Sequence, residues 1–240
     1  TLTTSISAFL AALLVGLLVP NQPIISVKTP TYKFLNFKAA FSNKLKISFI
    51  ISYAAHNFEL FAFRSWIVAL FIFLNSNKNN GISITNTGLI IAMMTILGTM
   101  ASIFGAKVCL YFPRSRIIRI IGVMTIILAG FSSFLLDGLI WLVTVSISLF
   151  YVSIMLDSGA LTAGIVANSE EKNRGSILAI YSMIGFTGSV IGPPTIGLML
   201  SINGGIEDLS AWRYALLTMV AGSISIIFFQ SKFFLKQDIP

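Results

Sequence analysis

Long apolar runs separated by short polar loops dominate the hydropathy pattern of this chain. Each run is close to the roughly 20 residues that an α-helix needs to cross a bilayer. The pattern predicts an all-α, polytopic membrane helix bundle with about seven transmembrane segments. These segments are Leu2–Val19, Ile47–Leu74, Thr85–Tyr111, Ile117–Leu136, Leu139–Val166, Ser176–Ile202 and Trp212–Phe229.

The composition agrees with a membrane protein. Of the 240 residues, 56% are hydrophobic and only 10% are charged, whereas a soluble domain carries roughly 25% charged residues. The single cysteine, Cys109, excludes an internal disulfide bond. One histidine and one cysteine also argue against a metal centre built from these residues. We therefore expect no metal and no cofactor.

Basic residues are distributed unevenly between the loops on the two sides of the predicted segments. Nearly all lysines and arginines lie on one side, which the positive-inside rule assigns to the cytoplasm. This distribution accounts for the net charge of +8 without a nucleic acid partner. The sequence predicts a multi-pass protein of the plasma (inner) membrane whose C-terminus is cytoplasmic.

The apolar runs and charged loops divide the chain into four predicted regions. The first run has no basic segment before it and resembles a helix already in progress, so we expect an N-terminal part that precedes Thr1. The regions are a first helix (1–20), a basic cytoplasmic loop (21–46), a six-helix bundle (47–232) and a cytoplasmic tail (233–240).

The basic loop places Phe34, Phe37 and Phe41 at helical spacing among lysines. This pattern favours a basic amphipathic helix that lies on the anionic inner leaflet of the bilayer. The alternative is a solvated linker whose aromatic rings pack on the bundle.

The second apolar segment contains the only histidine, His56, together with Asn57, Glu59 and Arg64. An ionisable side chain at the centre of a membrane helix costs about 2.5 to 3.5 kcal/mol, so these groups face protein or water. At about 100° per residue, Tyr53, Asn57 and Arg64 lie on one stripe of the helix. The polar arc favours a helix that lines a cavity.

The depth of each polar residue follows from the rise of an α-helix. His56 lies about 15 Å from the predicted inner end of its segment, and Asp157 in the fifth segment about 14 Å from its inner end, so the two share a depth. An imidazole beside a carboxylate can exchange protons near physiological pH. The first hypothesis is therefore a proton-coupling group of His56 and Asp157, to which Glu59 could belong.

Two further interpretations concern Glu59 and Arg64. The same rise places Arg64 about 27 Å from the inner end, close to the outer interface. As a fixed positive charge, Arg64 could attract an anionic substrate from outside. The structural alternative is that Glu59 and Arg64 pair with neighbouring side chains or extend to the outer interface.

Four local patterns occur in order along the chain. They are GAKVCLYFPRSR (Gly105–Arg116), EEKNRGSILAIYSMIGF around Arg174 and Gly175, GFTGSVIGPPTIG, and WRYALL at the start of the last segment. Together they resemble the C-terminal half, helices six to twelve, of bacterial major facilitator superfamily transporters.

The first two patterns resemble cytoplasmic loop motifs of that superfamily. The matching residues are Gly105, Arg114, Arg116, Arg174 and Gly175. The positions that usually hold Asp and Arg hold Leu110 and Tyr111 instead. A gating salt bridge at this loop is therefore in doubt, and anchoring of charge at the inner interface remains.

The third pattern concentrates small residues and prolines in one segment. These residues are Gly185, Gly188, Gly192, Pro193 and Pro194. Small residues let helix backbones approach closely, and proline bends a helix. One interpretation is a moving interface between rocking helices. The other is ordinary tight packing, since Gly and Pro are frequent in membrane helices.

The resemblance implies a six-helix C-terminal half plus one preceding helix. It also implies a secondary active transporter that moves a small solute by alternating access. The implied partners are the lipid bilayer, the N-terminal half of the same transporter, a small-molecule substrate and protons.

Other classes of function fit the sequence less well. No nucleotide-binding loop and no G-x-S-x-G nucleophile motif is present, so we expect no enzyme. The alternatives are a seven-helix receptor or another non-transporting membrane protein. A retinal protein is disfavoured, because the last segment, Trp212–Phe229, contains no lysine.

Overall fold

The chain folds into helices throughout the part that the computed structural model describes, which is residues 2–18, 35–78 and 84–231. The prediction of an all-α helix bundle is confirmed for these residues. The elements are α1 (Leu2–Leu18), α2 (Phe37–Ala40), α3 (Lys44–Lys78), α4 (Ile84–Tyr111), α5 (Arg114–Leu135), α6 (Ile140–Leu156), α7 (Ser158–Ala167), a 3₁₀ turn (Glu171–Asn173), α8 (Arg174–Ile202) and α9 (Leu209–Phe229).

Six stretches of the described residues are long and apolar enough to cross a membrane. They agree closely with the six predicted segments of the bundle, although α3 begins at Lys44 and continues to Lys78. The α1 helix has 17 residues, which is at the lower limit for a membrane span. It belongs to a separate unit, residues 1–32. Its assignment to a preceding half stays a prediction.

Only the end of the basic loop belongs to the described part of the chain. The rings of Phe37 and Phe41 stack on the exposed side of the short α2 helix. The Nζ atom of Lys46 is buried beneath this turn and donates to the Ala39 carbonyl and to Ser42 Oγ. The expected surface helix includes Phe34, which lies outside the described residues, as does the predicted tail, residues 233–240.

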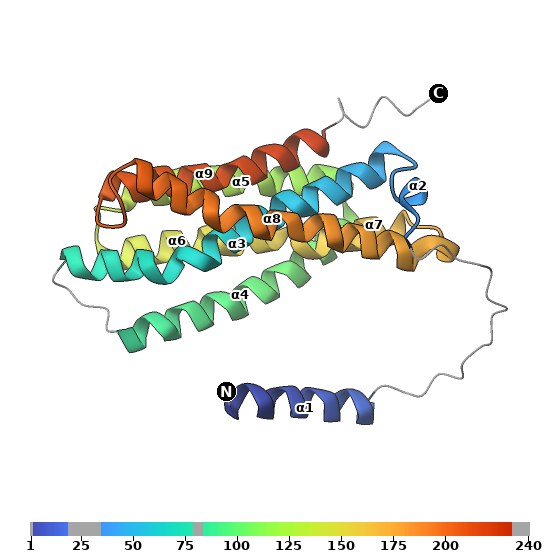
Figure 1. The fold of residues 1–240 in the computed structure, drawn as a ribbon, viewed down its shortest axis with the longest axis horizontal. Helices are drawn as coiled ribbons and strands as arrows, with labels where there is room; N and C mark the ends of the chain where they lie inside the picture. Colours follow the sequence, from blue (N-terminus) through green and yellow to red (C-terminus); the bar gives the residue numbers. More distant parts are fainter. Residues whose placement is uncertain (1, 19–34, 79–83, 232–240) are drawn as a thin grey trace. The chain divides into compact units, whose positions relative to one another are not determined.

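The axes of most helices in the bundle are roughly aligned, and α3 packs against α8 and α9 (Figure 1). Phe73 near the end of α3 contacts Trp212 near the start of α9. Gln230, after the end of α9, donates to Ser48 and Ser52 near the start of α3. The two helices are therefore antiparallel. We call the end of the bundle that contains Gln230 the inner end and the opposite end the outer end, following the predicted orientation.

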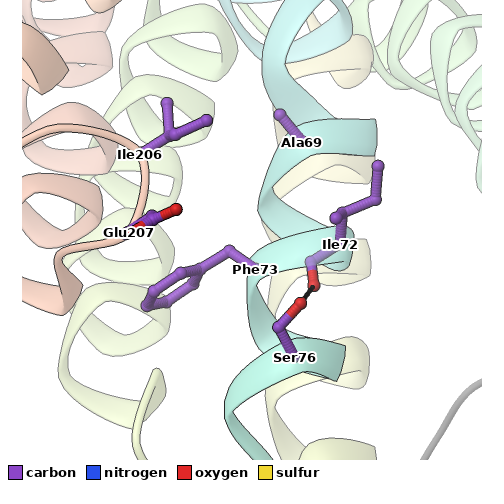
Figure 2. A pocket seen from close by; sticks show the side chains of 6 residues that line it. All are labelled: Ala69, Ile72, Phe73, Ser76, Ile206 and Glu207. Carbon is purple, nitrogen blue, oxygen red and sulfur yellow. Dashed lines mark hydrogen bonds between the residues drawn. The ribbon is translucent and has the colours of Figure 1, made fainter.

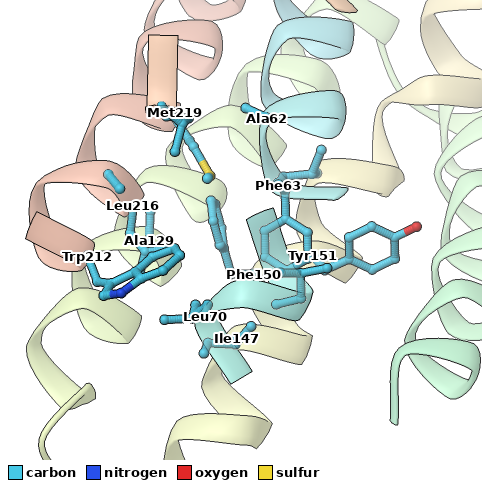
Figure 3. Packing of buried hydrophobic residues seen from close by; sticks show 14 of the residues in the cluster. Ala62, Phe63, Leu70, Ala129, Ile147, Phe150, Tyr151, Trp212, Leu216 and Met219 are labelled. Carbon is cyan, nitrogen blue, oxygen red and sulfur yellow. The ribbon is translucent and has the colours of Figure 1, made fainter. Parts of the chain in front are cut away.

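Two separate apolar cores fill the bundle. The outer core contains the aromatic side chains of Phe63, Phe150 and Trp212 (Figure 3). The inner core consists mainly of aliphatic side chains such as Ile165 and Ile180, together with Phe49. On α3, α9 and the α6–α7 span, buried polar residues occupy the boundary between the two cores. This boundary is the polar layer that contains the candidate site.

The fifth predicted segment, Leu139–Val166, is not one helix. It divides into α6 and α7, which meet at Asp157. Asp and Ser side chains favour helix ends, because they compete for backbone hydrogen bonds. The sequence Asp157–Ser158–Gly159 therefore weakens the helix at this point. The segment still forms a single span, Ile140–Ala167.

Two turns show how the sequence ends and starts these helices. Pro113 precedes α5, and its carbonyl accepts hydrogen bonds from the backbone N–H groups of Arg116 and Ile117. Between α8 and α9, Gly204 and Gly205 adopt positive φ angles of 112° and 90°, which favour glycine. Asp208 then caps α9, because its side chain accepts from the backbone of Ser210 and Ala211.

Candidate functional site

The centre of the candidate site is the contact between His56 of α3 and Asp157 at the α6–α7 junction. The Nδ1 atom of His56 lies 2.7 Å from Oδ1 of Asp157. Both residues are almost fully buried, with exposed fractions of 1% and 3%. The contact confirms that the two residues share a depth. It is an ion pair when the imidazole is protonated.

The helix junction at Asp157 is held in place by α4. A Cβ on Gly105 would overlap with the carbonyl oxygen of Leu156, and a Cβ on Gly159 would lie 2.6 Å from the carbonyl oxygen of Ser102. The backbones of α4 and of the α6–α7 junction are therefore in direct contact, and both glycines are required sterically. Gly105 lies inside α4, within the predicted segment Thr85–Tyr111, and begins the pattern that resembles a cytoplasmic loop motif.

An aromatic cluster extends from His56 toward the inner end. The ring of Tyr53 stacks on the ring of Tyr181 at 4.2 Å and on the imidazole of His56 at 6.1 Å between centroids. The hydroxyl of Tyr181 lies 3.2 Å from Oγ1 of Thr162 in α7. Tyr181 and Thr162 were not among the predicted site residues. A weak signal was available, because the helical rise places Tyr53, Tyr181 and Thr162 at about 10, 8 and 6 Å from the predicted inner ends of their segments.

Glu59 is also buried, but it contacts a different helix. Its Oε1 accepts a hydrogen bond of 2.6 Å from the backbone N–H of Ser223 in α9. Gly222 provides the space for this side chain, because a Cβ there would lie 2.5 Å from the Cγ of Glu59. No Lys, Arg or His in the described residues is within ion-pair distance of Glu59.

Arg64 lies on the surface of the bundle and contacts Tyr151 of α6. Its Nε and Nη2 atoms donate to the Tyr151 hydroxyl at 3.2 and 2.8 Å. A rise of about 1.5 Å per residue places Tyr151 roughly 16 Å from the outer end of α6. The position of Arg64 close to the outer interface stays a prediction.

Three residues of the polar arc of α3, His56, Asn57 and Glu59, are buried between helices rather than exposed to an open cavity. The Nδ2 atom of Asn57 makes no hydrogen bond with the described part of the chain. A pocket of about 400 Å³ lies elsewhere, between α3 and the α8–α9 loop at the outer end (Figure 2). Its lining contains none of the predicted site residues.

The glycines of α8 form the contact with α3. A Cβ on Gly185 would overlap with the ring of Tyr53, and a Cβ on Gly188 would overlap with the carbonyl oxygen of Ala54. Further along the helix, Gly192 makes a similar close contact with the backbone of Phe58. These glycines therefore allow the close approach of two backbones that small residues predict.

The two prolines of α8 lie inside a helix that continues from Arg174 to Ile202. The indole Nε1 of Trp66 donates to the carbonyl of Pro193 at 2.9 Å. This bond connects α3 and α8 beside Pro193 and Pro194. A role of this contact in movement stays a hypothesis.

The remaining motif residues lie at the inner ends of helices. Arg114 is the first residue of α5 and Arg116 follows in its first turn. Arg174 is the first residue of α8, and Gly175 follows it. A Cβ on Gly175 would have no neighbour within 4 Å, so no steric requirement for glycine exists there.

The described residues contain no cluster of three or more His, Cys, Asp or Glu side chains that could hold a metal ion. No known protein family, curated protein sequence or solved structure matches this chain. The polar layer is therefore the feature of the described residues from which a function can be inferred.

Proposed function

We propose that this bundle is one half of a secondary active transporter of the major facilitator type in the plasma membrane. It would move a small solute by alternating access, driven by a proton gradient. The observation that carries this proposal is the contact between His56 and Asp157, which joins α3 to the junction between α6 and α7.

The burial of this pair has an energetic cost. A buried ion pair is often no more stabilising than apolar residues of the same size. Ionisable residues inside a membrane span mark pathways for ions, protons or substrates in most cases. An imidazole beside a carboxylate can gain and lose a proton near physiological pH. The burial of His56 and Asp157 inside membrane-spanning helices and their close contact therefore support a role in proton coupling.

The position of the pair supports a link between protonation and movement. A proton on Asp157 would remove its negative charge and weaken the contact between α3 and the helix junction. Discontinuous helices near the midplane of the membrane are typical of transporter binding sites. Protonation would therefore act at the point where the α6–α7 span is interrupted.

The exposure of Arg64 supports a partner for this bundle. Its side chain is exposed on a membrane-spanning helix, and a lipid-facing arginine there is costly. This face would therefore contact an aqueous pathway or another protein segment. A second six-helix half would supply both.

The test is uptake of a panel of small solutes into vesicles by the full-length protein at external pH values between about 5 and 8. The variants are His56→Ala and Asp157→Asn. Asp137→Asn is the control, because that carboxylate is 62% exposed in an ion pair with Arg213. We expect one solute to show pH-dependent uptake that either site variant abolishes and the control preserves.

Two results would contradict the proposal. Uptake with unchanged pH dependence in both site variants would show that the pair does not couple protons. Absence of uptake for every solute, with the protein correctly inserted, would count against transport itself. Because half of a rocking pair has no closed pathway, we also expect residues 1–240 alone not to transport. Coexpression with a separate N-terminal half should restore uptake.

A further inference from the structure

The contact between Arg64 and Tyr151 leaves part of the guanidinium available for a ligand. An arginine side chain has five N–H donors in a rigid plane. The Nε and one Nη2 hydrogen are directed to the Tyr151 hydroxyl. No other hydrogen bond or ion pair connects Arg64 to the described residues. The remaining donors lie on an exposed side chain.

Among the described residues, no carboxylate lies within ion-pair distance of Arg64. Its hydrogen-bond partner is a neutral phenol, whose ring lies 5.8 Å from the guanidinium carbon. The partner residue lies roughly 16 Å from the outer end of α6, well inside the apolar span. A fixed cation at this depth is costly without a counter-charge. A bound anion would supply that charge.

The surroundings of Arg64 restrict the kind of anion. A crevice of about 20 Å³ beside it lies between α3, α4 and α6. Its lining is mostly apolar, with side chains such as Phe63, Ile67 and Met94. Thr95 contributes a second hydroxyl besides that of Tyr151, but this group already donates to the carbonyl of Ile91. The site therefore offers one fixed cation and an apolar wall.

This chemistry fits a monocarboxylate better than a more highly charged anion. The planar guanidinium binds a planar carboxylate through two parallel hydrogen bonds. A phosphate dianion would lose more hydration without further donors to replace it. The crevice holds little more than one water-sized group, so it would receive the apolar end of the ligand only in part.

We propose that Arg64 and Tyr151 form a carboxylate-binding subsite, which takes a small organic monocarboxylate with an apolar body. The subsite rests on the proposed function, since it would bind the transported solute. Tyr151 is the positioning residue, because its hydroxyl fixes the guanidinium. Arg64 supplies the charge and the hydrogen bonds to the carboxylate.

The test is ligand-induced thermal stabilisation of the full-length protein in lipid nanodiscs. The probes are acetate, butyrate and benzoate, with neutral benzamide and inorganic phosphate for comparison. We expect at least one carboxylate to raise the unfolding midpoint in a saturable manner, and benzamide to have no effect. Arg64→Gln should weaken this binding by about tenfold or more, as expected for a lost charged hydrogen bond.

Further variants separate the loss of the site from the loss of the fold. Arg64→Lys keeps the charge but not the planar pair of donors, so it should bind more weakly than the wild type and more tightly than Arg64→Gln. Tyr151→Phe should weaken binding through loss of orientation. Arg213→Gln is the control for arginine removal, because Arg213 pairs with Asp137 at the outer end, and it should bind as the wild type.

Several outcomes would overturn the subsite. They are stabilisation by phosphate alone, equal stabilisation by benzoate and benzamide, no shift with any carboxylate, or full binding by Arg64→Gln. The subsite would also be overturned if Arg64 pairs with an acidic residue of a second half. Exchange of the two charged residues would then restore a protein that either single change impairs. The assay requires no transport. Loss of carboxylate binding with His56-dependent uptake intact would therefore overturn the subsite and leave the proposed function standing. Carboxylate binding without any proton-coupled uptake would overturn the proposed function and leave the binding site at Arg64 standing.

Discussion

Gly105 of α4 lies so close to the carbonyl oxygen of Leu156 that any side chain at position 105 would overlap with it. Leu156 is the last residue of α6 before the span is interrupted at Asp157. The glycine therefore fixes the distance between α4 and the helix junction that presents Asp157 to His56. This role differs from that of a glycine in a cytoplasmic loop.

The first prediction concerns this contact. Gly105→Ala should lower the free energy of unfolding by about 1 to 3 kcal/mol, the usual cost of overpacking, because a backbone carbonyl cannot rotate away. The control is Gly130→Ala in α5, where a Cβ would meet no atom within 4 Å. Thermal unfolding of both purified variants in detergent gives the comparison. Equal stability of the two variants would show that α4 is free to move away from the junction.

The second prediction concerns the contact between α3 and α8. Gly188→Ala places a methyl group on the Ala54 carbonyl and near the backbone nitrogen of Phe58. We expect a loss of about 1 to 3 kcal/mol or a shift of α8 away from α3. Gly175→Ala in the same helix has open space, and should stabilise the helix by roughly 0.5 to 1 kcal/mol. We expect the unfolding midpoint to fall for Gly188→Ala and to rise for Gly175→Ala, relative to the wild type. A Gly188→Ala protein as stable as the wild type would contradict this prediction.

The sequence predicted the spans well, because each apolar run has the length that the bilayer requires. It also predicted the common depth of His56 and Asp157, because the rise per residue is nearly constant in both helices. The distance of Arg64 from the outer interface stays a prediction, because its printed contacts join it to Tyr151 and do not fix where the interface lies.

The contacts made around the polar layer could not be predicted in the same way. Which face of α9 meets Glu59 depends on how the two helices rotate during packing, and hydropathy does not record that rotation. The interruption at Asp157 was missed because one apolar run continues through it. The small residues Gly98, Ser102 and Gly105 at helical spacing were a usable signal for the face of α4 that packs on the α6–α7 span.

The third prediction concerns Glu59 and its bond to the backbone of Ser223. Glu59→Gln keeps an oxygen acceptor and nearly the same shape, so we expect stability close to that of the wild type. Glu59→Ala leaves the side-chain space empty, and should cost about 2 to 4 kcal/mol through the cavity and the lost hydrogen bond. Thermal unfolding distinguishes the two variants. A Glu59→Gln protein that unfolds like Glu59→Ala would show that the charge, not the acceptor, holds α3 and α9 together.

The fourth prediction concerns the bond between the Trp66 indole and the carbonyl of Pro193. Trp66→Phe removes the N–H donor and should lower the free energy of unfolding by about 1 to 2 kcal/mol. Trp141→Phe is the matched control, because Trp141 is 60% exposed at the start of α6. The comparison uses the unfolding midpoints of both variants. Similar midpoints would mean that the indole bond adds nothing to the contact between α3 and α8.

The last prediction concerns the energetic coupling of His56 and Asp157. His56→Ala leaves a buried carboxylate without its partner, and should destabilise the protein by about 3 to 5 kcal/mol. Asp157→Asn removes the charge and should cost less, because the amide is easier to bury. The double variant should be more stable than the sum of the two single losses predicts, since neither charge then remains. A thermodynamic cycle of unfolding free energies measures this coupling. Strict additivity would show that the 2.7 Å contact does not act as an ion pair, and the proposed coupling group would then lose its physical basis.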